Sequence, residues 1–122
     1  MAEVDLELKR LFTDFQMKIL ETRSKVKQIE NNIESLQRCS QKSNLTEMEL
    51  KTIPETVNTY QSVGRLFYKS PRNNIMASLK EKVKSNQERI EKLEKERGYL
   101  ENSLKESENN LREMISHKQG KS

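Results

Sequence analysis

The chain has 122 residues, of which 34% are charged and only 32% are hydrophobic. This composition leaves too little apolar surface for a compact globular monomer. The formal net charge of +4 comes from 23 basic and 19 acidic residues that are interleaved along most of the sequence, which is typical of solvated helix faces and not of a nucleic-acid-binding surface.

The first predicted element is a long helix over residues 5–43. Its apolar residues recur at alternating spacings of four and three, which is the a/d pattern of a coiled coil. The predicted seam consists of Leu8, Phe12, Phe15, Ile19, Thr22, Val26, Ile29, Ile33 and Leu36. A single helix cannot bury such a seam, so the sequence predicts a second helix packed against it.

The middle third of the sequence breaks the helical period. Thr46 and Glu49 have the spacing of a capping box, which predicts a short helix over residues 46–53 that ends before Pro54. Two runs rich in β-branched and aromatic residues follow on either side of Gly64, which can adopt a positive φ in a turn. These runs predict a β-hairpin over residues 56–69.

A second long helix is predicted over residues 71–118. Ser70 supplies an N-cap and Pro71 a proline at the first helical position, which is a strong start signal. The second seam consists of Met76, Leu79, Val83, Asn86, Ile90, Leu93, Arg97, Leu100, Leu104, Ser107, Leu111 and Met114. The short connection favours an antiparallel pair with both chain ends together and the hairpin at the opposite end. One register places Thr22 opposite Arg97, but the sequence does not fix it.

The predicted fold is therefore mainly α, with one domain over residues 1–122 made of a long antiparallel two-helix coiled coil joined by a β-hairpin. The hairpin is a candidate assembly surface, because a two-stranded hairpin has two open edges and is marginal alone. Its candidate residues are Val57, Tyr60, Val63, Gly64, Leu66, Phe67 and Tyr68. We expect hairpins of neighbouring subunits to pair with it. The alternative is that the hairpin folds back on its own coiled coil, which leaves both edges open.

Apolar residues also occur outside the seams towards the chain ends. These are Val4, Leu6, Leu11, Met17 and Leu20 in the first helix and Tyr99 and Ile115 in the second. A two-helix seam cannot bury them, which predicts a binding surface for an apolar partner. We assign this surface to Leu6, Leu8, Leu11, Phe12, Leu111, Met114 and Ile115. The alternative is that the chain ends simply tolerate exposed apolar residues.

The order of elements, with the run YQSVGRLF at residues 60–67 and VDLEL at residues 4–8, resembles the β-type subunits of prefoldin over essentially the whole chain. The resemblance implies a hexamer of two α-type and four β-type subunits, with the hairpins forming an intersubunit β-barrel body. It also implies coiled-coil arms that capture unfolded proteins such as actin and tubulin without ATP and deliver them to the cytosolic chaperonin.

Several other functions are disfavoured by the sequence. His117 is the only histidine and Cys39 the only cysteine, so we expect no enzyme activity, no metal site and no cofactor. No continuous basic helix precedes the heptads, and no apolar run spans a membrane, so we expect neither a nucleic-acid nor a membrane partner. The acidic start lacks the pattern of a secretory signal, which predicts a cytoplasmic protein. The aromatic hairpin disfavours the remaining alternative, a homodimeric coiled-coil scaffold.

Overall fold

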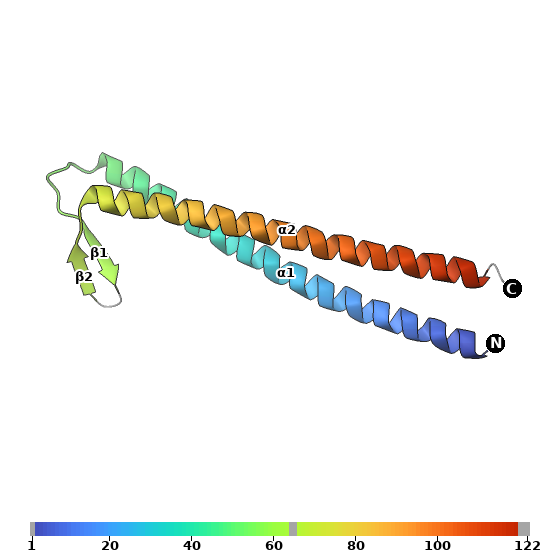
Figure 1. Ribbon diagram of the computed structural model, residues 1–122. Coiled ribbons are helices and arrows are strands. Elements are labelled where there is room, and N and C mark those ends of the chain that lie inside the picture. The colour runs from blue at the N-terminus through green and yellow to red at the C-terminus, as the bar shows by residue number, and fades with distance from the viewer. Residues whose placement is uncertain (1, 64–65, 120–122) are drawn as a thin grey trace. The chain divides into compact units, whose positions relative to one another are not determined.

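The computed structural model describes residues 2–63 and 66–119, and the side chains of residues 6–62 and 66–117. Four elements follow one another along the chain: helix α1 (Ala2–Thr52), strand β1 (Tyr60–Val63), strand β2 (Leu66–Lys69) and helix α2 (Arg72–Gln119) (Figure 1). The predicted mainly helical fold with a hairpin between two long helices is confirmed. The chain divides into two compact units, unit 1 (Met1–Asn31 with Leu93–Ser122) and unit 2 (Asn32–Lys92).

Helix α1 is one continuous element, so the predicted division into helices over residues 5–43 and 46–53 is wrong. Thr46 does not cap a new helix, because its Oγ1 donates a 2.8 Å hydrogen bond to the carbonyl oxygen of Lys42, as in a helix interior. The spacing of four and three also continues beyond Leu36, through Ser40, Ser43, Glu47 and Leu50. The unbroken heptad phase keeps one face of α1 against α2, although these positions are mostly polar.

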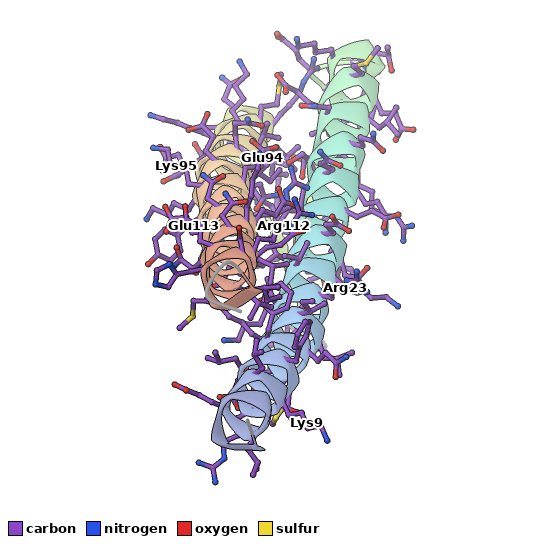
Figure 2. The ribbon with its side chains drawn as sticks, turned by 90° about the vertical axis from the view of Figure 1, so that its right-hand side faces the viewer. Lys9, Arg23, Glu94, Lys95, Arg112 and Glu113 are labelled. Carbon is purple, nitrogen blue, oxygen red and sulfur yellow. The ribbon has the colours of Figure 1, made fainter. Side chains whose placement is uncertain are left out.

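In unit 1 the first part of α1 lies antiparallel beside the last part of α2. The predicted seam residues Ile29 and Leu111 are buried, each with less than a tenth of its surface exposed. Charged side chains take the outer faces, and Arg23 on α1 and Lys95 on α2 point away from the facing helix (Figure 2). At these positions the heptad pattern predicted correctly which face of each helix is covered.

The register in unit 1 differs from the predicted option of Thr22 opposite Arg97. An ion pair of 4.0 Å joins Arg97 to Glu30, and Thr22 lines a shallow hollow together with Leu104. The polar seam residues Thr22 and Arg97 therefore do not face each other. The Arg97 guanidinium reaches a carboxylate at the exposed edge, while the small neutral Thr22 is buried.

In unit 2 the seam between the helices is partly polar. Asn86 is buried on α2 and its Nδ2 donates a 3.3 Å hydrogen bond to Oγ of Ser40 on α1. One and two turns further along α1, Ser43 is buried, and Glu47 forms an ion pair of 3.6 Å with Lys80. Buried polar pairs of this kind specify the register of a coiled coil at some cost in stability.

The hairpin of unit 2 is shorter than predicted. Its strands pair antiparallel, with Tyr60 opposite Lys69 and Ser62 opposite Phe67. Residues 56–59 lie outside the strands, because the backbone N–H of Val57 donates a 3.1 Å hydrogen bond to the carbonyl oxygen of Pro54 and closes a turn there. The predicted turn residue Gly64 lies outside the described residues.

Hydrogen bonds close the base of the hairpin and join the start of α2 to the residue that follows α1. The backbone N–H of Ser70 donates a 2.9 Å hydrogen bond to the carbonyl oxygen of Thr59, and the Thr59 hydroxyl donates back to the carbonyl oxygen of Ser70. The Arg72 guanidinium donates to the carbonyl oxygen of Ile53 at the end of α1. These hydrogen bonds hold the strands at a defined place beside the start of α2.

Candidate interaction surfaces

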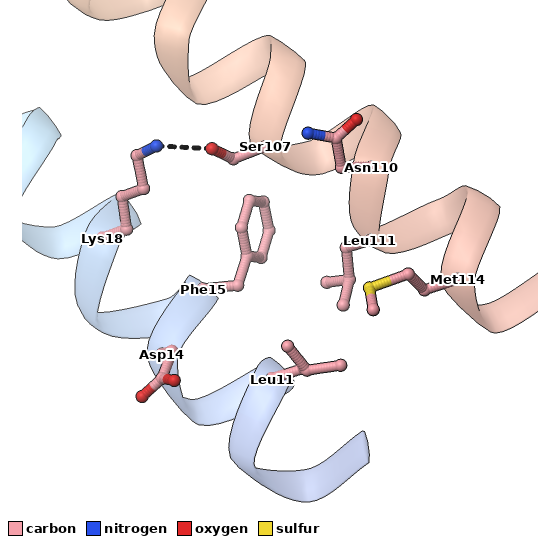
Figure 3. A pocket seen from close by; sticks show the side chains of 8 residues that line it. All are labelled: Leu11, Asp14, Phe15, Lys18, Ser107, Asn110, Leu111 and Met114. Atoms are coloured by element: carbon pink, nitrogen blue, oxygen red, sulfur yellow. Dashed lines mark hydrogen bonds between the residues drawn. The ribbon is translucent and has the colours of Figure 1, made fainter. Parts of the chain in front are cut away.

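An open groove of about 230 Å³ lies between the two helices of unit 1 (Figure 3). We call it the terminal groove. Its lining residues are Leu11, Asp14, Phe15 and Lys18 from α1 and Ser107, Asn110, Leu111 and Met114 from α2. Both sets are spaced by three, four and seven residues, so each set occupies one face of its helix.

The terminal groove has an apolar interior with polar groups beside it. Phe15 and Leu111 lie between the two helices, and the thioether of Met114 reaches towards Leu111 (Figure 3). The Lys18 ammonium donates a hydrogen bond to Oγ of Ser107, and this contact bridges the helices at one end of the groove. The apolar side chains in the interior of such a groove can pack against apolar side chains of a partner.

The structure brings together three of the residues predicted for apolar binding, namely Leu11, Leu111 and Met114. Leu8 and Ile115 are half-buried and do not line the groove. Phe15 lines the groove but was not predicted as a binding residue. Its position in the first seam was the signal available in the sequence, because a groove beside a coiled-coil seam is lined by seam residues.

The expectation that Leu11 lies outside the packed face while Phe12 lies within it is wrong. Leu11 is half-buried in the terminal groove, whereas Phe12 is 45% exposed. A straight helix with 3.6 residues per turn drifts by about 20° per heptad from an ideal 3.5-residue repeat, and near a helix end nothing corrects this drift. Because of this drift, Leu11 and not Phe12 lines the side of the groove that faces α2.

A second apolar surface runs along the outside of α1. It consists of Leu6, Met17 and Leu20, all more than half exposed, and we call it the outer stripe. Leu6 and Met17 are eleven residues apart, which is close to three helical turns, and Leu20 is one turn further along. Leu6 was assigned to the binding surface from the sequence. Met17 and Leu20 were recognised as off-seam residues but were not included in the predicted set.

The hairpin presents apolar side chains on both of its faces. Leu66 is 75% exposed and Phe67 is 74% exposed, and Val57, Tyr60 and Tyr68 are exposed as well. The register places Leu66 and Tyr68 on one face of the hairpin and Phe67 on the other. The helical segments of unit 2 therefore leave the hairpin exposed, which disagrees with the alternative in which it folds back on the base of its own coiled coil. Val63 belongs to β1, but its side chain lies outside the described ones.

Neither helix has, within its described residues, an apolar stretch long enough to cross a membrane. Across residues 2–63 and 66–119 no three His, Cys, Asp or Glu side chains gather in a way that would hold a metal ion.

Two long helices joined by an exposed antiparallel hairpin define a helix–hairpin–helix class of coiled-coil protein. A family model described as prefoldin subunit matches residues 13–118. Prefoldin subunit 1 of Homo sapiens is 43% identical over 114 residues, which cover 93% of each chain. Prefoldin subunit 1 of Arabidopsis thaliana is 32% identical over 109 residues, covering 89% of this chain and 85% of that one.

The chain therefore belongs to the prefoldin family, whose members are co-chaperone subunits that assemble with one another. The crystal structure of the prefoldin beta subunit from Thermococcus strain KS-1 matches with a TM-score of 0.70 at 20% identity, covering 88% of this chain and 91% of that chain. This likeness concerns the fold, and it confirms the β-type architecture expected from the hairpin residues.

Proposed function

We propose that the chain is a non-catalytic subunit of a cytoplasmic heterohexamer containing two α-type and four β-type prefoldin subunits. In this proposal the complex needs no cofactor or metal. It holds unfolded proteins such as actin and tubulin without ATP and delivers them to the cytosolic chaperonin. The observation that carries the proposal is that the chain has two different apolar surfaces, the exposed hairpin in unit 2 and the open terminal groove in unit 1.

The hairpin is the proposed assembly surface. Its strands leave backbone N–H and C=O groups at both edges, and strand pairing with another chain satisfies them. Burying Leu66 or Phe67 against a neighbouring subunit contributes about 1.5–3 kcal/mol per side chain. Several hairpins closing into a β-barrel body remove every edge, which a pair of hairpins does not achieve.

The terminal groove and the outer stripe are the proposed client-binding surfaces. Their backbone groups are already hydrogen-bonded within helices, so they offer apolar side chains and no strand-like edge. Such contacts do not require a defined sequence or a folded partner. Each is weak, but the same contact repeated on several arms of one complex holds a chain through multivalency.

The test is a comparison of assembled complexes that differ only in this chain. In the test variant Leu11→Ser and Met114→Ser remove apolar side chains from the terminal groove, while buried Leu111 is kept to preserve packing. The matched control is Leu45→Ser with Met48→Ser, an exposed apolar pair on α1 in unit 2. Suppression of aggregation of denatured actin is measured against the concentration of each complex.

We expect the groove variant to need about two- to threefold more complex for half-maximal suppression, because the other subunits keep their own arms. The control should match the wild-type complex. An unchanged dose–response for the groove variant, or an equal loss in the control, would remove the terminal groove from client binding. Native mass spectrometry establishes beforehand that every variant enters the complex.

A further inference from the structure

The net charge of the chain is concentrated in one short segment. Residues 69–84 contain five basic residues, Lys69, Arg72, Lys80, Lys82 and Lys84, and a single acidic residue, Glu81. This segment therefore has a formal charge of +4. The whole chain also has a net charge of +4, so the remainder is electrically balanced. We call residues 69–84 the basic segment.

Most of this charge is not neutralised within the chain. Lys69, Lys82 and Lys84 are exposed and have no acidic partner in the described part of the chain. Lys80 does form an ion pair with Glu47, but the lysine side chain stays 65% exposed. Three unpaired ammonium groups within sixteen residues produce a local positive potential that an acidic surface complements.

The basic segment is continuous with the proposed assembly surface. Lys69 is the last residue of β2 and lies directly opposite Tyr60 in the hairpin. The hydrogen bonds between Thr59 and Ser70 join the two ends of the hairpin, and α2, which carries the remaining basic residues, begins two residues after Ser70. A subunit that adds strands to this hairpin therefore meets Lys69 at the end of β2 and comes close to the start of α2, and Lys82 and Lys84 follow about three helical turns further along that helix.

We propose that the basic segment selects the neighbour of this subunit, favouring a prefoldin subunit with an acidic surface beside its own hairpin and disfavouring a second copy of this chain. Two copies in a symmetric contact bring the same segment from each subunit together, and like charges repel. The apolar hairpin supplies affinity for any compatible strand, and the charge supplies the discrimination. This inference rests on the proposed role of the hairpin in assembly.

The experiment compares charge variants in the complete complex with the other prefoldin subunits. In the test variant Lys69, Lys82 and Lys84 are all changed to Gln, and in a second variant all three are changed to Arg. The matched control changes three exposed lysines of unit 1, Lys25, Lys95 and Lys105, to Gln. Incorporation is measured by native mass spectrometry between about 50 and 500 mM salt, a range that shortens the screening length from over 10 Å to below 5 Å.

At low salt we expect the Gln variant of the basic segment to bind its partner subunits about tenfold more weakly than the wild type, since it loses three exposed charge pairs. The difference should vanish at high salt, and the Arg variant and the unit 1 control should behave as wild type. By sedimentation velocity the isolated Gln variant should self-associate more than the wild type at low salt. The inference would be overturned if the Gln variant of the basic segment and the wild type were incorporated equally at every salt concentration. It would also be overturned if the isolated Gln variant did not self-associate more than the wild type.

Two further measurements keep the inference separate from the proposed assembly role. In one outcome Phe67→Asp is excluded from the complex at every salt concentration while the Gln variant of the basic segment behaves as wild type. This outcome would refute only the charge selection. A Phe67→Asp variant that incorporates normally would refute assembly through the hairpin itself. Binding of a single-stranded DNA probe to the intact complex, lost in the Gln variant without any change in assembly, would assign the basic segment to nucleic acid and overturn the inference.

Discussion

The proposed client-binding surface of unit 1 and the proposed assembly surface of unit 2 are built on different kinds of backbone. In unit 1 the terminal groove lies between helices, whose backbone hydrogen bonds are internal. In unit 2 the hairpin exposes Leu66 and Phe67 on strands with unpaired edges. An edge requires a partner strand of matching geometry, whereas a helical groove accepts any apolar chain. The backbone beneath an apolar surface therefore decides how selective that surface is.

The two units also differ in charge and in the chemistry of their seams. Basic and acidic residues are equal in number in unit 1, while unit 2 carries the whole net charge of +4. The seam of unit 2 contains the buried Asn86, hydrogen-bonded to Ser40. Unit 2 thus combines three features that restrict partners or register, namely strand edges, net charge and a polar seam pair.

The largest expected effect is on assembly, from Phe67→Asp. An aspartate in a buried intersubunit sheet lacks a partner charge, and its desolvation costs several kcal/mol. We expect this variant to be absent from the complex in native mass spectrometry and to retain its helical circular dichroism. Leu45→Asp is the matched control, because Leu45 is an exposed apolar residue of unit 2 that lies on α1 and not in a strand, so its incorporation should fall much less. Equal incorporation of both variants would show that the strands are not the assembly element.

Much of this contrast was predictable from the sequence. The heptad spacing located both helices, and Gly64 between two β-prone runs located the hairpin, since these signals depend on local periodicity. The continuation of α1 through Ser43 and Glu47 was not predictable in the same way. Polar residues at a and d positions weaken the apolar signal, and only contact with α2 shows that the face continues.

The terminal groove was predictable only in part. Leu111 and Met114 line the groove, and their place at the end of the second seam was visible in the sequence. Which of the adjacent residues Leu11 and Phe12 faces α2 depends on a rotation of tens of degrees at a helix end, and a heptad frame does not resolve such a rotation. The register between the helices was likewise open, because it depends on specific pairs such as Glu30 with Arg97.

A smaller effect is expected from replacing the polar seam pair of unit 2. Asn86→Leu removes the hydrogen bond to Ser40 and leaves an apolar seam that fits more than one register. Spin labels at Lys42→Cys and Lys84→Cys, in a Cys39→Ser background, report the spacing of the two helices. We expect one narrow distance distribution with Asn86 and a broader one with leucine, at similar helix content. If the distance distribution had the same width in both variants, the register would be set by contacts other than the hydrogen bond between Asn86 and Ser40.

The smallest effect is expected from a single change in the outer stripe. Leu20→Ser removes one exposed side chain that contributes at most about 1.5–3 kcal/mol when buried on a client, in one arm of several. We expect less than a twofold loss in suppression of client aggregation. Arg38→Ala, which removes an exposed ion pair with Glu34, is the control and should have no effect. A loss after Leu20→Ser larger than that of the groove variant would make the outer stripe the principal client contact.

The most direct test of the division between the two units is site-specific photocrosslinking. Phe12, which follows Leu11 of the terminal groove in unit 1, and Phe67 in unit 2 are both exposed aromatic residues. Each is replaced in turn by the photoreactive benzoylphenylalanine in the assembled complex loaded with denatured actin. We predict that the probe at Phe67 crosslinks only to other prefoldin subunits, whether or not a client is bound, and that the probe at Phe12 crosslinks to the client. Crosslinks from Phe67 to the client, or from Phe12 to prefoldin subunits alone, would contradict the assignment of assembly to unit 2 and client binding to unit 1.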